Sequence, residues 1–293
     1  MVDIKVVNSD AIKYLEETKI NDVSLTFFDP PFNQGKDYKY FNDEISSEEY
    51  WEWVRKVLRG IQRITKTGGS IYFMQREKNT EGVLRCLRET GWELQNLIIW
   101  RKMSSAVPGS TRYGKEYQII AYATKGEKAV TFNKLRIDLP IPANWKQPRD
   151  KGIYVTDVWP DIRELTSGYL AGEEPLRARD GERLHLQQSP LDLLVRIILS
   201  SSMPDDLVFD PCAGTGTTLI AAKQLERNAI GVEIDPNNAK LIERRIKQNR
   251  TADNINIPDK IKYYRFTENL EKIWPAAERI SLKRYGLYVG EKE

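Results

Sequence analysis

Residues 29–32 form the first segment of the chain whose residue types suit ligand chemistry. The tetrapeptide Asp29-Pro30-Pro31-Phe32 ends the strongly apolar run 23–28. Because prolines have no amide hydrogen, this backbone offers carbonyl groups as pure acceptors. A carboxylate beside such carbonyls can hold an amino group through both of its hydrogens, and a phenylalanine ring can stack on a base. The alternative interpretation is a turn that ends a strand and carries a core phenylalanine.

A second segment, residues 207–218, is an apolar run followed by an acidic residue and a glycine-containing turn. Gly214 and Gly216 permit tight turns and the close approach of a ligand. Glu233 lies 17 residues beyond Gly216, near the ~20-residue spacing of a carboxylate that binds ribose hydroxyls. A Walker-type ATP site would need a lysine after the glycine, and a dinucleotide site would need a small residue where Leu219 stands. An adenosine ligand without a pyrophosphate therefore fits this segment best.

Both segments need strands to place them, and the surrounding pattern supplies candidates. Short apolar runs alternate with amphipathic stretches, which is typical of an α/β fold with a mostly parallel sheet. We expect a helix to open at Ser189-Pro190, with Ser189 as its N-cap, and Asp235-Pro236 repeats this pattern. Strands are predicted at 23–28, 70–74, 94–100, 118–123, 207–209 and 229–233, and helices at 47–65, 80–90, 190–202, 217–227 and 236–249.

The alternation fails over residues 126–184, where prolines and isolated aromatic residues accumulate, so an inserted region is predicted there. Residues 250–293 are predicted to be an appendage of unknown role. The chain length of 293 residues suits one large domain with an insertion. Two cysteines and one histidine exclude a disulfide framework and a multi-histidine metal centre, and no metal is expected. No apolar run is long enough for a membrane span, and no export signal opens the sequence.

The net charge of +3 is unevenly distributed along the chain. Residues 101–151 hold 11 Lys and Arg against 4 Asp and Glu, a net charge of +7, so the remainder carries −4. A basic segment on a nearly neutral body is typical of a protein that binds a polyanion. A solvated, loop-rich face is equally compatible with the charge alone.

Taken together, the two segments resemble a known family. Asp29-Pro30-Pro31-Phe32 is similar to the catalytic motif of the S-adenosylmethionine-dependent DNA amino-methyltransferases, and residues 210–218 are similar to their cofactor loop. The motif order, catalytic first and cofactor loop last, resembles the β group, which methylates adenine N6 or cytosine N4. Phe32 stands where the family commonly has tyrosine, and Leu186 and Ser189 stand where it commonly has proline and lysine.

The resemblance implies a Rossmann-like methyltransferase fold with a mostly parallel, seven-stranded sheet. Residues 1–125 would form the catalytic half, 126–184 the target-recognition insertion and 185–249 the cofactor-binding half. With no lysine at Ser189, the helix N-terminus there would receive the cofactor's carboxylate. The S-adenosylmethionine contacts that the resemblance implies are Asp10, Asp29, Gln188, Ser189, Asp210, Cys212, Ala213, Gly214, Thr215, Gly216, Thr217, Thr218, Glu233, Ile234 and Asp235.

The implied reaction is methyl transfer to the exocyclic amino group of a base flipped out of double-stranded DNA. Asp29, Pro30, Pro31 and Phe32 would be the catalytic set, in which Asp29 and the Pro30 carbonyl accept hydrogen bonds from the amino group and Phe32 stacks on the base. Aspartate at position 29 favours adenine N6, and cytosine N4 is the alternative. DNA contacts are expected at Arg101, Lys102, Arg112, Lys115, Lys134, Arg136, Lys146, Arg149 and Lys151.

Rival functions remain open at this stage. They are an RNA or protein amino-methyltransferase, a non-catalytic nucleic-acid-binding subunit and, more distantly, an oxidoreductase. The resemblance also implies a cytoplasmic protein, with a cognate restriction endonuclease and a second copy of the chain as candidate partners.

Overall fold

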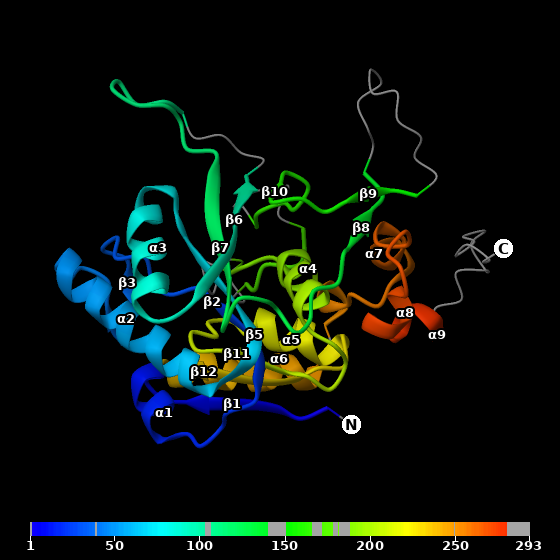
Figure 1. The fold of residues 1–293 in the computed structure, drawn as a ribbon, viewed down its shortest axis with the longest axis horizontal. Helices are drawn as coiled ribbons and strands as arrows, with labels where there is room; N and C mark the ends of the chain where they lie inside the picture. The colour runs from blue at the N-terminus through cyan, green and yellow to red at the C-terminus, as the bar shows by residue number, and fades with distance from the viewer. Residues whose placement is uncertain are drawn as a thin grey trace.

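The centre of the molecule is an eight-stranded mixed sheet (Figure 1). Its strands are β1 (Ile4–Asn8), β2 (Val23–Phe28), β5 (Thr65–Arg76), β6 (Glu93–Arg101), β7 (Tyr117–Thr124), β10 (Val158–Trp159), β11 (Leu207–Asp210) and β12 (Asn228–Glu233). The spatial order is β1-β12-β11-β2-β5-β7-β6-β10. In the run β1-β12-β11-β2-β5 each strand is parallel to its neighbours. Strand β7 is antiparallel to both β5 and β6, and β10 is parallel to β6. The predicted mostly parallel α/β fold is confirmed, and the two-residue β10 is one strand more than the seven expected.

The computed structural model describes residues 2–38, 40–102, 107–139, 151–165, 172–177, 181, 188–248 and 250–279. The two small additional sheets pair β3 (Asp37–Tyr38) with β4 (Phe41–Asn42) and β8 (Arg136–Ile137) with β9 (Ile153–Tyr154). The helices are α1 (Ala11–Glu17), α2 (Ser47–Ile64), α3 (Thr80–Glu89), α4 (Leu191–Ser201), α5 (Thr217–Gln224), α6 (Pro236–Gln248), α7 (Pro258–Tyr263), α8 (Leu270–Ile273) and α9 (Ala276–Arg279), with 3₁₀ turns η1 (Glu77–Asn79) and η3 (Thr251–Asp253). Within this described part, no helix is long and apolar enough to cross a membrane.

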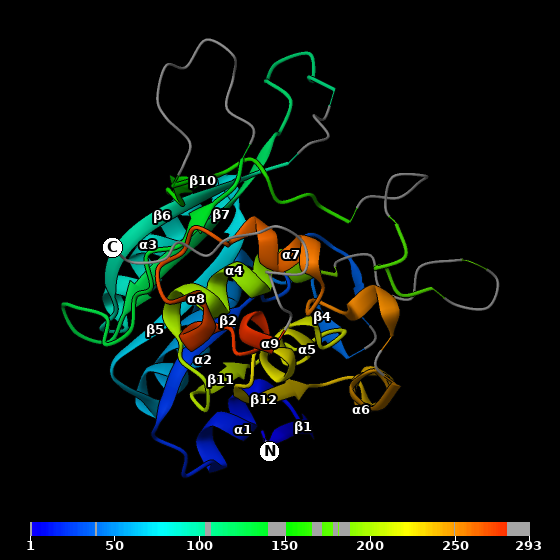
Figure 2. The same ribbon diagram turned by 90° about the vertical axis from the view of Figure 1, so that its right-hand side faces the viewer.

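Helices cover both faces of the sheet, which makes three layers (Figures 1 and 2). Side chains of β2 reach both faces: Val23 and Phe28 pack with α1, α2 and α3, whereas Leu25 and Phe27 pack with α4, α5 and α6. Val23 and Leu25 lie on opposite faces because the pairing with β5 shifts register between them. All six residues of β2 are buried, as a central parallel strand requires. This strand delivers Asp29 to the edge of the sheet.

Local sequence explains where α2 begins and which face it buries. Ser46 and Glu49 form a reciprocal capping box at its N-terminus. Tyr50, Val54 and Ile61 recur at helical spacing and are buried against the sheet. The first turn of α2 therefore lies beneath the chain that follows β2, and its Tyr50 faces that chain.

The insertion and the C-terminal segment both join the main core. Leu135 and Ile137 of the insertion are buried in the same cluster as α4 and α5. Trp274 of the C-terminal segment is fully buried in that cluster, and its indole N–H donates to Asn256 Oδ1 at 2.7 Å. Figure 1 shows α7, α8 and α9, in orange and red, beside β8 and β9. The described residues 250–279 are thus part of the folded core.

Three features of the amino-acid pattern were misjudged or missed. The strand β1 and the helix α1 were not predicted. With five residues of mixed polarity in β1 and seven residues in α1, both elements are too short to give a clear hydrophobic periodicity. The N-cap prediction for Ser189 is wrong: α4 begins at Leu191 after Pro190, which makes no side-chain cap. The hydroxyl of Ser189 donates instead to Asp29. The cap prediction for Asp235 is confirmed, since its Oδ1 accepts the Asn237 amide at 2.8 Å.

Candidate functional site

The predicted site residues gather at one edge of the sheet. Strands β1, β12, β11, β2 and β5 are parallel, and β6 runs in the same direction because both β5 and β6 are antiparallel to β7. Their carboxyl ends therefore meet at a single edge, the place where α/β proteins bind ligands. Asp29 follows β2, Asp210 ends β11 and Glu233 ends β12. Asp10 follows β1, and Lys102 follows β6.

A hydrogen bond from the segment that precedes α4 holds Asp29 at this edge. The Ser189 hydroxyl donates to Asp29 Oδ2 at 3.1 Å. Burial raises the pKa of the Asp29 carboxyl to about 7; the Ser189 bond opposes this rise, and the charge of Asp210 adds to it. Lys102 and Lys36 lie near enough to lower that pKa in part. The carboxyl group is therefore poised between its two protonation states near neutral pH.

The backbone after Asp29 is anchored by a buried hydrogen-bond chain. Tyr50 Oη donates to the Pro31 carbonyl at 2.8 Å, and Gln75 Nε2 donates to Tyr50 Oη at 2.8 Å. Tyr50 and Gln75 are 2% and 0% exposed, so this chain is shielded from water. Because it uses the Pro31 carbonyl as an acceptor, it fixes the direction of the Pro30-Pro31 backbone.

A buried carboxylate organises the turn that follows Phe32. Asp43 Oδ1 accepts the Asn33 amide at 2.7 Å, and Asp43 Oδ2 accepts the Gln34 and Lys36 amides at 3.0 and 3.1 Å. Asn33 has a φ of 53° in the left-handed region, which asparagine tolerates. Phe32 itself is 7% exposed, so the chain covers most of its ring.

The segment after β11 is built around Asp210. Asp210 Oδ2 accepts the Thr218 hydroxyl at 2.5 Å, and Asp210 Oδ1 accepts the Cys212 amide at 3.0 Å. Burial raises the pKa of Asp210 to about 7, opposed by these bonds and helped by the charge of Glu233. Burial also raises the pKa of the Cys212 thiol well above its usual value. Cys212 is therefore a neutral packing residue and not an activated nucleophile.

Glycine is sterically required at position 216 of the turn. This residue has a φ of +79°, and a Cβ there would lie 2.5 Å from Ile242 Cγ2 on α6. Glu233 holds the other side of the turn, because its Oε2 accepts the Gly214 amide at 2.7 Å and its Oε1 accepts the Asp235 amide at 2.9 Å. Burial raises the pKa of Glu233. The turn and the end of β12 are thus joined through one carboxylate.

Several predicted cofactor contacts have roles inside the protein. Asp10 caps α1 by accepting the Lys13 amide, and Ala213 donates its amide to the Val232 carbonyl. The Gln188 amide group accepts from the Leu176 N–H at 3.0 Å and donates to the Glu174 carbonyl at 3.2 Å. Thr215 and Thr217 are buried in the turn, and Ile234 lies 36% exposed after β12.

The N-terminus of α4 differs from the expectation that it would receive the cofactor's carboxylate. The first amide of the helix, that of Leu191, donates to Glu174 Oε1 at 2.6 Å. Burial raises the pKa of Glu174 to about 7, and the Leu191 bond opposes that rise. A carboxyl group of the chain itself thus holds the first donor of this helix.

The predicted DNA contacts divide into four groups. Arg112, Lys134 and Lys151 are exposed. Arg101, Lys115 and Arg136 have partners within the chain, which are Glu116, Glu77 and the ring of Tyr154. Lys102 lies beside the catalytic edge: burial lowers the pKa of its ammonium, and Glu164, Asp29 and Glu77 oppose that shift. Lys146 and Arg149 lie outside the described residues, as does His185.

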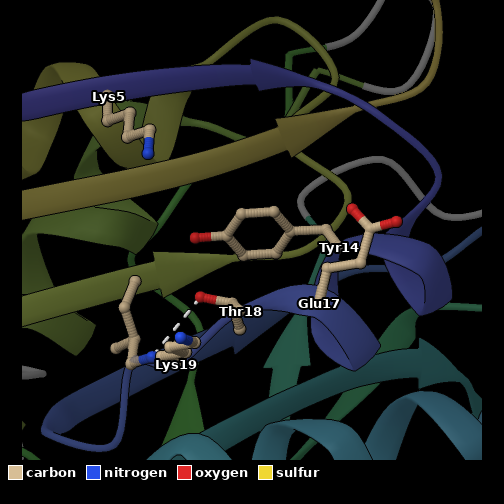
Figure 3. A pocket seen from close by; sticks show the side chains of 6 residues that line it. Lys5, Tyr14, Glu17, Thr18 and Lys19 are labelled. Atoms are coloured by element: carbon tan, nitrogen blue, oxygen red, sulfur yellow. Dashed lines mark hydrogen bonds between the residues drawn. The ribbon is translucent and has the colours of Figure 1, made fainter.

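A surface hollow of about 520 Å³ lies away from this edge (Figure 3). Its lining comes from the C-terminal end of α1 and from β1, with the Tyr14 ring pointing across it. Since α1 runs back from the carboxyl edge, this hollow is near the amino ends of the strands. It brings together none of the predicted site residues.

The acidic edge suits a positively charged ligand. Asp29, Asp210 and Glu233 are buried carboxyl groups whose pKa values burial raises, which shows that their ionised forms are poorly compensated. A nearby cation stabilises ionised carboxylates. S-adenosylmethionine carries a sulfonium and an ammonium group, and its ribose hydroxyls are partners for a carboxylate at the position of Glu233. The residues present therefore fit this cofactor.

The fold and this edge define a class, that of Rossmann-like S-adenosylmethionine methyltransferases. A family model described as "DNA methylase" matches residues 23–244. The DNA adenine methyltransferase YhdJ of Escherichia coli (strain K12) is 30% identical over 255 residues, which cover 82% of each chain. The chain belongs to this DNA methylase family, and it is an S-adenosylmethionine-dependent DNA methyltransferase of the adenine-N6 or cytosine-N4 kind.

Solved structures support the fold. The M1.HpyAVI–SAM complex has a TM-score of 0.54 and 22% identity, and the match covers 83% of this chain and 99% of that one. The PvuII DNA methyltransferase, described as cytosine-N4-specific, has a TM-score of 0.61 and 18% identity, over 86% of this chain and 89% of that one. Both are similar in architecture to the present chain.

The sequence did not predict the residues whose hydrogen bonds support the site's backbone segments. Tyr50 and Gln75 support the catalytic segment, and Glu174 occupies the start of α4. Arg245 and Asp253 lie under the glycine turn. No motif marks any of them, because each acts through a partner that is distant in sequence or outside the matched motifs.

Proposed function

We propose that this enzyme methylates the N6 amino group of adenine in double-stranded DNA, on a base flipped out of the helix. Two observations favour adenine over cytosine N4. The first residue of the catalytic segment is Asp29, and the relative YhdJ, at 30% identity, is named as an adenine enzyme. The similarity to the cytosine-N4 enzyme PvuII is at 18% identity and speaks for the fold alone.

One observation carries the assignment of the catalytic residue. Asp29 ends a fully buried strand at the carboxyl edge, beside the cofactor segment, with Ser189 bound to its Oδ2. We assign Asp29 Oδ1 and the Pro30 carbonyl as the acceptors for the two hydrogens of the target amino group. This arrangement turns the nitrogen lone pair toward the methyl donor. The Phe32 ring, which is 7% exposed, would stack on the base once the base's entry uncovers it.

S-adenosylmethionine supplies an activated methyl group bonded to its sulfonium, so the chain need not form a covalent bond to the base. Asp210 and Thr218 hold the turn that receives the cofactor, and Glu233 binds its ribose. The ionised Asp29 carboxylate would accept a hydrogen bond from the amino group while the methyl group passes from sulfur to nitrogen. The S–C bond breaks as the N–C bond forms, the thioether S-adenosylhomocysteine is left, and one amino proton is released to solvent. Cys212, whose thiol pKa is raised by burial, takes no part as a nucleophile.

The basic residues are proposed to contact DNA phosphates. Arg112, Lys134 and Lys151 are the exposed members, and Arg101, Lys115 and Arg136 would exchange their internal partners for phosphate. Lys102 is proposed to act nearer the chemistry, since its ammonium lies close enough to Asp29 to affect its pKa. A cognate restriction endonuclease, a homodimer and a cytoplasmic location are further proposals from the resemblance.

The variant Asp29→Ala tests this function. We expect the loss of methyl transfer to duplex DNA, measured by transfer of labelled methyl. Calorimetry should show that S-adenosylmethionine still binds, though more weakly because one of three carboxyl groups is gone. Nucleoside mass spectrometry of the wild-type product should show N6-methyladenine. The finding of N4-methylcytosine would overturn the choice of base, and transfer by Asp29→Ala near the wild-type rate would overturn the role of Asp29.

A further inference from the structure

Beneath the glycine turn lies a buried charged pair that the matched family region does not contain. Arg245 is in the last turn of α6, and Asp253 is in η3; both lie beyond residue 244, where the family match ends. Arg245 Nε donates to Asp253 Oδ2 at 2.8 Å, and Nη2 donates to Asp253 Oδ1 at 2.8 Å. The two side chains are 1% and 3% exposed. This two-point geometry fixes the orientation of the guanidinium.

The remaining nitrogen of that guanidinium reaches the cofactor turn. Arg245 Nη1 donates to the Thr215 carbonyl at 2.9 Å and to Thr217 Oγ1 at 3.2 Å. Thr215 lies between Gly214 and Gly216, both with positive φ. A carbonyl in such a tight turn lacks a regular backbone partner, and a buried carbonyl without a donor is costly. Arg245 supplies the donor.

The same face of α6 supports the turn sterically. Ile242 and Arg245 are three residues apart and therefore share one side of the helix. Ile242 Cγ2 would lie 2.5 Å from a Cβ on Gly216. The turn thus rests on Ile242 and is bonded by Arg245, so a displacement of the Arg245 side chain would displace the turn.

A second arginine, Arg250, links Asp253 to the backbone at Glu173. Arg250 Nη1 donates to Asp253 Oδ1 at 3.5 Å, and its Nη2 donates to the Glu173 carbonyl at 2.7 Å. The neighbouring Glu174 carboxyl group holds the first amide of α4, two residues after Ser189. The C-terminal segment is therefore joined to the cofactor turn through Arg245 of α6, and Arg250 joins it to the residue that precedes Glu174.

We propose that Asp253 is a positioning residue for cofactor binding, acting through Arg245 on the turn at residues 214–217. This inference rests on the proposed function, in which that turn binds S-adenosylmethionine. It makes the C-terminal segment part of the cofactor site. Buried ion pairs are weak evidence of stability, so a purely structural role is the alternative that the experiment must separate.

The test compares Asp253→Asn with Asp161→Asn. Asp161, in the insertion, forms the matched pair with Arg196, and the two side chains are 5% and 1% exposed. The hydrogen bonds of Asp161 that the structure describes go to Arg196 and Tyr263, not to the turn. Both variants leave a buried arginine without its carboxylate, so both should lower the melting temperature. We expect the dissociation constant for S-adenosylmethionine, measured by calorimetry without DNA, to rise about tenfold only in Asp253→Asn. The methyl-transfer rate at saturating cofactor should fall by no more than about twofold.

Two further variants keep the inference falsifiable. The double variant Arg245→Met, Asp253→Leu removes both charges and should regain stability, yet bind cofactor weakly because Thr215 has lost its donor. Asp253→Glu should restore part of the affinity. Equal cofactor affinity in Asp253→Asn and Asp161→Asn, or wild-type affinity in the double variant, would overturn the positioning role.

A reference variant separates this inference from the proposed function. Gly216→Ala should weaken cofactor binding by at least about tenfold, because the added Cβ meets Ile242. If Gly216→Ala binds cofactor as the wild type does, the turn is not the cofactor site and the proposed assignment of that turn fails. If it binds weakly while Asp253→Asn binds normally, only the role of Asp253 fails.

Discussion

The hydroxyl of Tyr50 is the most informative single atom to remove from this enzyme. It accepts from Gln75 Nε2 and donates to the Pro31 carbonyl, each at 2.8 Å, in a region closed to water. In Tyr50→Phe both partners stay buried without a hydrogen bond. At about 1–3 kcal/mol for each of the two unsatisfied groups, the free energy of unfolding should fall by about 2–6 kcal/mol.

The catalytic consequence follows from the position of the Pro31 carbonyl. Release of that carbonyl frees the backbone that carries Asp29 and the Pro30 carbonyl, and a misplacement of ~1 Å can cost ~10²-fold in rate. We expect the single-turnover rate of methyl transfer to fall about 10- to 100-fold. The affinity for S-adenosylmethionine should change little, because Tyr50 touches no residue of the cofactor turn in the hydrogen bonds that the structure describes.

Tyr72→Phe is the matched control. Tyr72 is a residue of β5, and its side chain lies in the core cluster on the face of the sheet opposite to that of Tyr50. Its hydroxyl is 2.8 Å from Ser201 Oγ. It should lose stability without losing the single-turnover rate. The double variant Tyr50→Phe, Gln75→Leu should recover part of the stability, because the Pro31 carbonyl still lacks its donor, and none of the rate. Equal rates in Tyr50→Phe and Tyr72→Phe, with both proteins folded, would refute the reasoning.

The remaining predictions concern pH and salt. Since burial raises the pKa of Asp29 to about 7 and the mechanism needs the ionised carboxylate, the rate at limiting cofactor should rise with pH through about 7. Ser189→Ala should move that midpoint upward, because the Ser189 bond lowers this pKa; a pH-independent rate between pH 6 and 8 would contradict the argument. Arg112→Ala should weaken DNA binding and reduce the slope of log K against log salt by about 1, at unchanged cofactor affinity. An unaltered slope would remove Arg112 from the phosphate contacts.

Six strands of the central sheet and the two ligand-binding segments were predictable because their signals are local, whereas β1 and the two-residue β10 were not predicted. β2 is a continuous apolar run that ends at Asp29, and the prediction of 23–28 matches the observed strand. β11 and its glycine turn are as recognisable, since Gly216 needs a positive φ wherever the turn lies in space. Burial of both faces of a central strand and backbone freedom at glycine are properties of short stretches of sequence, so the sequence alone determined them.

Tertiary structure alone decided how the site is held. The residues around Ser189 predict a helix cap, but packing brings its hydroxyl to Asp29 and brings the Glu174 carboxyl group to the start of α4. The Tyr50 and Arg245 contacts likewise join elements whose approach depends on the whole core. Which partner a side chain meets depends on which surfaces pack together, and local sequence patterns do not predict that packing.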